Sequence, residues 1–213
     1  MLTVHHLGKS QSERIVWLCE ELAIPYQLKC YARDPVTMLA PSEFKALHPA
    51  QGAPVITDGA LVLAESGAII EYIIAKHGTG RLALGADHPD YAGYLYWFHF
   101  ANGSFQPNMG RNMVLHRLNL AADNPTLLVM KARLDRAFDL VEARLGVAKY
   151  FAGSAFTAAD IMMVFSLTTM RYFMPRDITP YPHLLAYLRR IGEREAYQRA
   201  MRKGDPGMVL LLV

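Results

Sequence analysis

Two short segments carry side chains whose types and spacing could bind a small charged molecule. Ser10 lies at the start of a predicted helix, where its hydroxyl could donate to an anion at the positive helix end or form a capping box with Glu13. Glu65 and Ser66 begin another predicted helix. The Ser66 hydroxyl and free backbone amides there suit a carboxylate, and the Glu65 side chain suits an ammonium group. This pair is typical of a site for a zwitterion, although Ser66 could also be a simple cap.

The first 80 residues alternate between strand-like and helical patterns. Strands are predicted over residues 2–7, 26–31, 54–57 and 61–64, and helices from Ser10 to just before Pro25, over 41–47, and from Glu65 to Gly78. A turn at residues 58–60 joins the last two strands as a hairpin. The predicted order is therefore β-α-β-α-β-β-α.

Only helices are predicted beyond a linker rich in turn residues at 80–89. The first starts near Pro89, is dense in aromatic residues and has a possible break at residues 103–107. Three more are predicted around residues 134–145, from Thr157 and after Pro182. The second half is thus expected to be all helical.

Charge and cysteine content exclude several other classes of protein. Lys and Arg number 22 against 19 Asp and Glu and are spread along the chain, so nucleic acid is not an expected partner. The two cysteines, Cys19 and Cys30, lie in apolar stretches and are expected to be core residues, which fits a reducing cytoplasm.

Membrane and cofactor signals are also missing from the sequence. The N-terminus lacks a signal-peptide pattern and the apolar residues 208–213 are too few to cross a bilayer, so a soluble, unprocessed protein is expected. Because there is no clustered Cys/His set and no Gly-rich phosphate loop, neither a metal nor a nucleotide is expected.

Four local patterns, in order along the chain, resemble those of the cytosolic glutathione transferases. They are residues 10–14 (SQSER), 48–54 (HPAQGAP), 65–66 (ES) and 151–160 (FAGSAFTAAD). The resemblance covers essentially the whole chain and is to the serine-type members, theta-like or of a related bacterial or fungal class. It implies an α/β thioredoxin-like domain over residues 1–80, a linker over 81–88 and an all-α helical bundle domain over 89–213.

The resemblance implies that a serine at the start of the first helix contacts the thiol of glutathione. Ser10 is predicted to donate to the sulfur, with Ser12 as the alternative donor. The predicted glutathione-binding residues are His48, Gln51, Ala53, Pro54, Glu65 and Ser66. Pro54 is expected to be a cis-proline that exposes the backbone of Ala53 to the cysteinyl peptide, with the polar side chains of His48 and Gln51 toward the glycine end.

Two further sets of residues follow from the same resemblance. The family binds its electrophile in the cleft between the domains, and Phe105, Met109 and Arg111 are candidates for this hydrophobic co-substrate site. Thr157 and Asp160 are expected to be structural, as the cap and the returning acidic residue of a capping box.

The implied activity is that of a glutathione S-transferase, which activates the glutathione thiol as a thiolate for attack on a hydrophobic electrophile. The alternative is a noncatalytic protein of the same fold with a binding or regulatory role. Glutathione is the expected co-substrate, and a cytoplasmic homodimer that acts in detoxification, with no nucleic-acid or membrane partner, is expected. The electrophile, and the choice among transfer, peroxide reduction, dehalogenation and ether cleavage, stay open.

Overall fold

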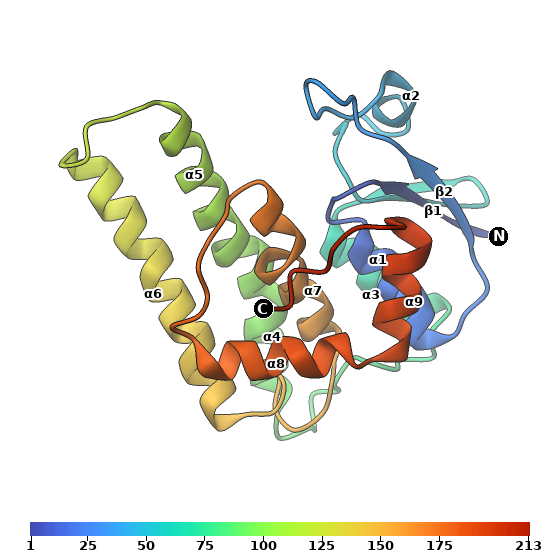
Figure 1. The fold of residues 1–213 in the computed structure, drawn as a ribbon. Coiled ribbons are helices and arrows are strands. Elements are labelled where there is room, and N and C mark those ends of the chain that lie inside the picture. Colours follow the sequence, from blue (N-terminus) through green and yellow to red (C-terminus); the bar gives the residue numbers. More distant parts are fainter. The chain divides into compact units, whose positions relative to one another are not determined.

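The computed structural model describes residues 1–213, which form two compact units (Figure 1). The first unit combines Met1–Ala83 with Ile191–Leu210, and the second combines Leu84–Arg190 with Leu211–Val213. The sequence predicts that all residues after 88 belong to the second domain. In the structure, Ile191–Leu210 instead belong to the first unit. None of the helices has both the length and the hydropathy that a membrane-spanning segment needs.

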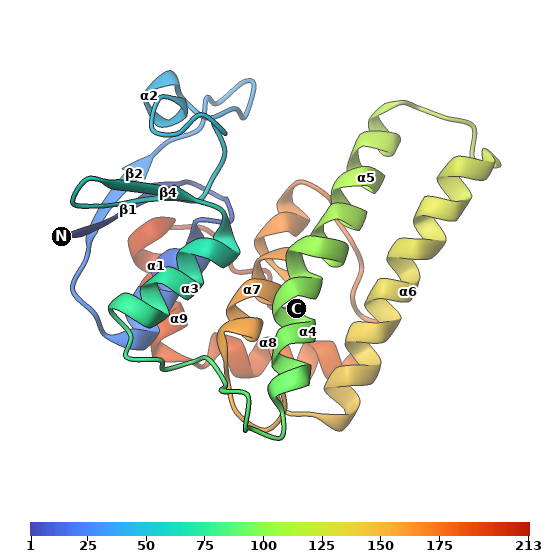
Figure 2. The same ribbon diagram turned by 180° about the vertical axis from the view of Figure 1, so that it is seen from behind.

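The first unit is built on a four-stranded mixed sheet with the order β2-β1-β3-β4. Its strands are β1 (Leu2–Leu7), β2 (Gln27–Tyr31), β3 (Val55–Asp58) and β4 (Leu61–Ala64), and its first helices are α1 (Glu13–Leu22), α2 (Ser42–Lys45) and α3 (Ser66–Lys76). β1 runs parallel to β2 and antiparallel to β3, which pairs with β4 as a hairpin. Helices α1 and α3 lie on one side of the sheet and α2 on the other (Figure 2). This is the predicted β-α-β-α-β-β-α order and a thioredoxin-like arrangement.

Helix α1 is buried along nearly its whole length, because it is covered on more than one side. Its apolar residues Ile15 and Leu18 have no exposed surface, and the helix ends at Ala23, which adopts a left-handed conformation two residues before Pro25. The β1 strand that leads into α1 is equally apolar, with Val4 completely buried. The loop between β1 and α1 is therefore held at both ends by the core of the unit.

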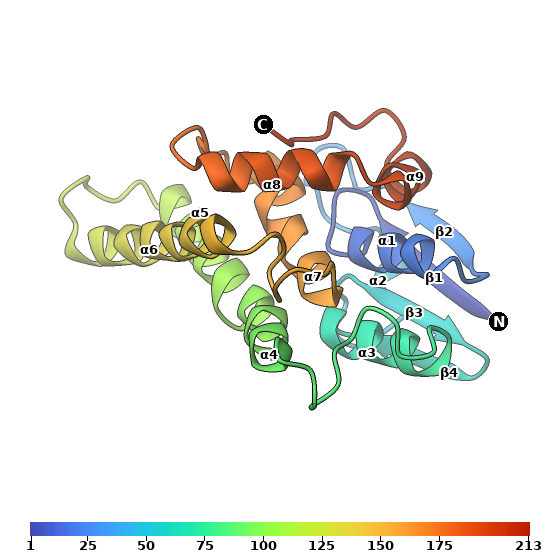
Figure 3. The same cartoon turned by 90° about the horizontal axis from the view of Figure 1, so that it is seen from below.

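A C-terminal helix, α9 (Glu195–Gly204), packs along α1 in the first unit (Figure 3). The rings of Trp17 and Tyr197 meet edge to face at 4.9 Å, and Arg194 donates two hydrogen bonds of 2.7 Å to Glu21. Glu20 accepts from Arg199 and forms an ion pair with Lys203 in the last turn of α9. This helix was not among the four predicted for the second half.

The second unit contains only helices. They are α4 (Tyr91–Phe100), a π-helical turn (Ala101–Phe105), α5 (Gln106–Arg117), α6 (Pro125–Val147), α7 (Ala158–Leu167), a 3-10 turn (Thr169–Tyr172) and α8 (Pro182–Gly192), the last of which continues to the boundary of the unit. The predicted break at residues 103–107 is wrong. A π turn accommodates an extra residue within the helix, and Pro107 lies in the first turn of α5, where its missing N–H costs little.

The start of α7 confirms the predicted capping box of Thr157 and Asp160. The Asp160 carboxylate accepts hydrogen bonds from the backbone N–H groups of Phe151 and Thr157 and from the hydroxyl of Tyr187. Complete burial raises the pKa of Asp160 to about 6 against the opposing effect of these bonds. The side chain thus fastens the preceding loop to the helix and has a structural role.

The packing of α9 on α1 predicts a large stability loss on truncation of Tyr197, which is almost completely buried. Tyr197→Ala is expected to lower the free energy of unfolding by about 3 kcal/mol, because it leaves a cavity against Trp17. Arg202→Ala, at an exposed position of the same helix, is the control and should change it by less than about 0.5 kcal/mol. Urea denaturation measures both, and equal effects would contradict the packing described for α9.

Candidate active site

Ser10 and Ser12 lie in the short loop between β1 and α1, and their hydroxyls contact each other. The two Oγ atoms are 2.7 Å apart, and Ser10 Oγ also accepts from the backbone N–H of Ser12 at 3.2 Å. Ser12 is completely buried, whereas Ser10 keeps 4% of its surface exposed. Of the two hydroxyls, only that of Ser10 belongs to a residue that reaches the surface.

The capping box considered for Ser10 and Glu13 is not formed. Helix α1 has Ser12 as its N-cap, and no side chain makes a cap hydrogen bond there. The Ser10 hydroxyl instead serves the loop itself, through its two contacts with Ser12. Ser10 therefore does not cap α1.

The buried Ser12 hydroxyl continues into a chain of polar groups that ends near the C-terminus. Ser12 Oγ lies 2.9 Å from His6 Nδ1, and His6 Nε2 lies 3.0 Å from Asp205 Oδ2. The other carboxylate oxygen of Asp205 accepts from the backbone N–H of Lys9 at 3.0 Å. Asp205 directly follows α9, so the packing of that helix positions a carboxylate behind the loop that carries Ser10.

Glu65 and Ser66 lie where β4 leads into α3, next to the start of α1. The Ser66 hydroxyl accepts from Arg14 Nη1 at 3.2 Å and lies 3.3 Å from Gln11 Oε1, which also accepts from Arg14 at 2.8 Å. Burial lowers the pKa of Arg14 to about 9, partly offset by the charge of Glu13. The beginnings of two helices thus meet at a cluster of polar side chains, beside which Glu65 is exposed.

Glu65 has an unusual backbone conformation. Its φ is 74° and its ψ is 121°, a region that residues with a side chain rarely adopt. It is the N-cap of α3 and makes no side-chain cap hydrogen bond. The conformation is maintained by the surrounding structure, as is frequent at binding sites.

The loop between α2 and β3 carries the remaining predicted binding residues. The Ala53–Pro54 peptide bond is cis, as expected from the sequence, and directly precedes β3. His48 is half-buried, and its Nδ1 accepts from the backbone N–H of Ala50 at 3.1 Å. Gln51 is exposed, with a φ of 53°. The side chain of His48 is therefore engaged in its own turn, and that of Gln51 faces solvent.

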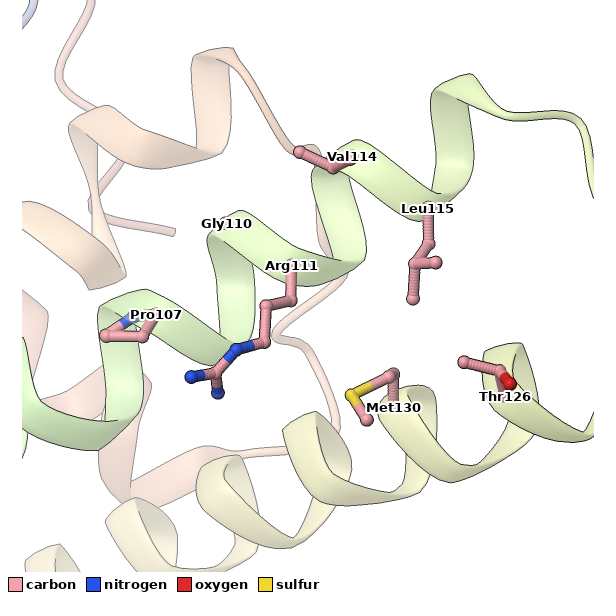
Figure 4. A pocket seen from close by; sticks show the side chains of 7 residues that line it. All are labelled: Pro107, Gly110, Arg111, Val114, Leu115, Thr126 and Met130. Carbon is pink, nitrogen blue, oxygen red and sulfur yellow. The ribbon is translucent and has the colours of Figure 1, made fainter.

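The residues predicted for the co-substrate site have unequal access to ligands. Phe105 and Met109 have no exposed surface, and Phe105 packs against Phe138 with ring centroids 5.0 Å apart. Arg111 is exposed and lines an open, mostly apolar hollow of about 520 Å³ between α5 and α6 (Figure 4). Met130 lies across from it on α6 (Figure 4). Arg111 thus borders an open space within the helical unit, whereas Phe105 and Met109 are buried, and the assignment of all three stays a prediction.

Comparison with known protein families identifies the chain. Residues 10–76 match the family model for the glutathione S-transferase N-terminal domain, and residues 64–190 match that for the C-terminal domain. The chain belongs to the glutathione S-transferase family of enzymes. Ser10 is the first residue of the matched region, and Glu65 and Ser66 lie within both matches.

Individual members of the glutathione S-transferase family are similar over almost the full length. Glutathione S-transferase 3 of Schizosaccharomyces pombe is 29% identical over 227 residues, covering 99% of this chain and 91% of the relative. A crystal structure of a glutathione S-transferase from Actinobacillus pleuropneumoniae is 33% identical, with a TM-score of 0.87 over 96% of this chain and 93% of the other. A theta class enzyme from Xanthomonas axonopodis pv. citri, solved with glutathione bound, shares the fold at 24% identity and a TM-score of 0.72, covering 93% and 96% of the chains.

Several residues of this site were not assigned from the sequence. Gln11 and Arg14 lie within the pattern of residues 10–14. The apolar residues 15–19 that directly follow Arg14 were a signal that Arg14 would be buried near the site. His6 lay in a predicted strand without any sign of a role. Asp205 is 199 positions away from His6, so no local pattern could relate the two.

The conformation of Glu65 predicts an unusual response to glycine. Glu65→Gly should be more stable than Glu65→Ala by about 1 kcal/mol, because glycine adopts a positive φ without steric cost. At Glu71, an exposed position inside α3, the same pair should differ by about 1 kcal/mol in the opposite direction, because glycine weakens a helix interior. Chemical denaturation of the four variants gives the comparison. If glycine is the less stable residue at both positions, the strain at Glu65 is refuted.

Proposed function

We propose that this enzyme binds glutathione at the starts of α1 and α3, and that the Ser10 hydroxyl stabilises the glutathione thiolate for attack on a hydrophobic electrophile. The observation that carries the proposal is the position of Ser10 at the positive end of α1, with its other hydrogen-bond contacts confined to Ser12. The proposal requires no metal and no nucleotide.

The energy available at Ser10 is sufficient for this task. A free thiol has a pKa of about 8.5, and lowering it to about 6.5 takes about 2.7 kcal/mol. One hydrogen bond to a charged acceptor contributes about 1.5–3 kcal/mol, and the helix end contributes about 0.3–1 kcal/mol. Together they make thiolate the main form at neutral pH without a neighbouring base in contact with the sulfur.

The zwitterionic end of glutathione suits the start of α3. The first backbone amides of this helix receive no side-chain cap, so they can bind a carboxylate together with the Ser66 hydroxyl. The buried charge of Arg14, 3.2 Å from Ser66 Oγ, adds to the attraction for an anion. The exposed Glu65 carboxylate is the partner for the ammonium group.

The cysteinyl peptide is assigned to Ala53, whose backbone precedes the cis bond to Pro54. Backbone N–H and C=O groups at this place pair with a peptide in the manner of a strand. His48 and Gln51 remain the proposed neighbours of the glycine end.

The other expectations from the sequence stay predictions. A homodimer is supported by exposed apolar residues on the second unit's α5 and α6, among them Val114, Leu128 and Val129, and by Leu118 directly after α5. A cytoplasmic location, a role in detoxification and the use of Phe105, Met109 and Arg111 for the electrophile are proposed on the family resemblance. A noncatalytic role would not require a thiol donor, so the Ser10 experiment below also addresses that alternative.

Ser10→Ala is expected to raise the pKa of the bound glutathione thiol by about one to two units, because it removes one hydrogen bond to the charged sulfur. Conjugation at neutral pH should slow accordingly, while the Kd for glutathione changes little. The ultraviolet absorbance of the thiolate, titrated in the complex, measures this pKa. Ser104→Ala, an exposed serine of the other unit, is the control. An unshifted titration in Ser10→Ala would reject the assignment of Ser10.

Glu65→Gln and Ser66→Ala are each expected to raise the Kd for glutathione about tenfold, which corresponds to about 1.4 kcal/mol. The physical reason is the loss of one charged or hydrogen-bonding partner of the zwitterion. Isothermal titration calorimetry gives the Kd. Glu71→Gln, on the exposed side of the same helix, should bind as the wild type does. Equal affinity in all four proteins would remove the zwitterion site from α3.

A further inference from the structure

Behind Ser10 lies an unbroken series of polar groups that the proposed function does not use. From Ser10 Oγ it runs 2.7 Å to Ser12 Oγ, 2.9 Å to His6 Nδ1, and from His6 Nε2 3.0 Å to Asp205 Oδ2. His6 and Ser12 have no exposed surface. Of the two serines and the histidine, only Ser10 keeps any exposed surface, and Asp205 is partly exposed at the far end of the series.

The directions of these hydrogen bonds follow from how many protons each group carries. A carboxylate only accepts, so His6 Nε2 carries a proton and donates it to Asp205. In a neutral ring Nδ1 then accepts from the Ser12 hydroxyl at 2.9 Å, which is the shorter contact of that hydroxyl, since the other acceptor beside it, the backbone oxygen of Leu7, lies 3.3 Å away. Because the backbone N–H of Leu7 also donates to Ser12 Oγ at 3.0 Å, one lone pair of Ser12 remains, and the Ser10 hydroxyl donates to it. The Ser10 proton then points inward, and its oxygen can accept from a thiol.

We propose that this series is a relay that takes up the proton of the glutathione thiol, with His6 as the final acceptor; the proposal rests on the assignment of Ser10 to the thiol. The S–H bond breaks as its proton moves to Ser10 Oγ. The original proton of Ser10 moves to Ser12 Oγ, and that of Ser12 moves to His6 Nδ1. Each hydroxyl keeps one proton, the sulfur becomes a thiolate, and His6 becomes an imidazolium.

After the transfer every hydrogen bond points the other way. His6 donates to Ser12, Ser12 donates to Ser10, and Ser10 donates to the thiolate. The backbone N–H groups of Leu7 and Ser12 still donate to Ser12 Oγ and Ser10 Oγ, so each hydroxyl oxygen accepts two hydrogen bonds. The same contacts thus satisfy both states, and the second state presents Ser10 as the donor that the thiolate needs.

The groups that face His6 come from the segment after α9, from the start of α1 and from β2. Asp205, after α9, is the charged group in direct contact with it, and α1 presents only the Ser12 hydroxyl to it. On β2 the register partner of His6 is Cys30, which is exposed and not in the core as expected from the sequence; desolvation and the charge of Asp205 raise the pKa of its thiol. Arg33 also lies in the field of Asp205 and donates to the backbone oxygens of Gly8 and Lys9.

Contact with the backbone keeps the ring of His6 in place. Gly204, the last residue of α9, lies so close that a Cβ there would come within 3.0 Å of His6 Nε2. The ring therefore cannot tilt toward α9, and Nδ1 stays directed at Ser12. His6 and Asp205 act on glutathione only through the two serines, so they are positioning residues for the thiolate.

The direct test is nuclear magnetic resonance of the full chain with 15N-labelled histidine rings, at neutral pH, without and with saturating glutathione. His6→Gln identifies the His6 signal among the eight histidines. We expect a ring protonated on Nε2 alone in the free enzyme, and on both nitrogens once glutathione is bound as thiolate. An unchanged His6 ring in the complex would overturn the relay.

Variants give a second readout that a purely structural role would not move. Ser12→Ala interrupts the relay and Asp205→Asn removes the charge that stabilises the imidazolium, and each should raise the pKa of the bound thiol by about one unit, a tenfold loss of thiolate at neutral pH. Glu21→Gln is the matched control, because it weakens another attachment of α9, to Arg194, without touching the relay. If it shifts the thiol pKa as much as Asp205→Asn does, Asp205 only holds the helix and the relay is wrong.

The two proposals fail in different ways. If the thiol pKa is not lowered in the wild type, or if Ser10→Ala leaves it unchanged, the assignment of Ser10 fails and the relay falls with it. If Ser10 behaves as proposed but His6 keeps one proton in the complex, only the relay fails. Should one of the relay variants not fold, the other variant and the wild-type spectra still decide.

Discussion

The buried hydroxyl of Ser12 is the contact on which the geometry of the candidate site depends. Ser12 directly precedes α1, and its hydroxyl contacts Leu7 and His6 at the end of β1 and Ser10 in the loop. A buried polar group left without its partner costs about 1–3 kcal/mol, so these segments keep one arrangement. Ser10 is thereby held just before the start of α1.

The same contact makes the site depend on the end of the chain. Asp205 reaches His6 and the loop only because α9 returns to the first unit and packs on α1 through Tyr197 and Arg194. The helix therefore does more than cover apolar surface. It also brings the carboxylate of Asp205 into contact with His6, which belongs to the thioredoxin-like part.

Local patterns predicted what local physics determines. The order of strands and helices in the first 80 residues and the capping box of Thr157 each depend on a few neighbouring residues, and both were predicted from the sequence. The cis bond before Pro54 was expected from the family resemblance and is present. The helical break near Gly103 was predicted wrongly, because a π turn absorbs the residues that usually end a helix. Helix α9 and the partnership of His6 with Asp205 were missed, since they depend on contacts between distant segments. The positive φ of Glu65 could not be predicted either, because glutamate rarely adopts this conformation.

The central claim is that the Ser10 hydroxyl meets the sulfur of glutathione, and a crystal structure of the complex tests it most directly. The account predicts the sulfur within hydrogen-bonding distance of Ser10 Oγ, with Ser12 remaining behind it and the γ-glutamyl group at the start of α3. A sulfur bound by a different side chain, with Ser10 Oγ in contact with Ser12 alone, would contradict it.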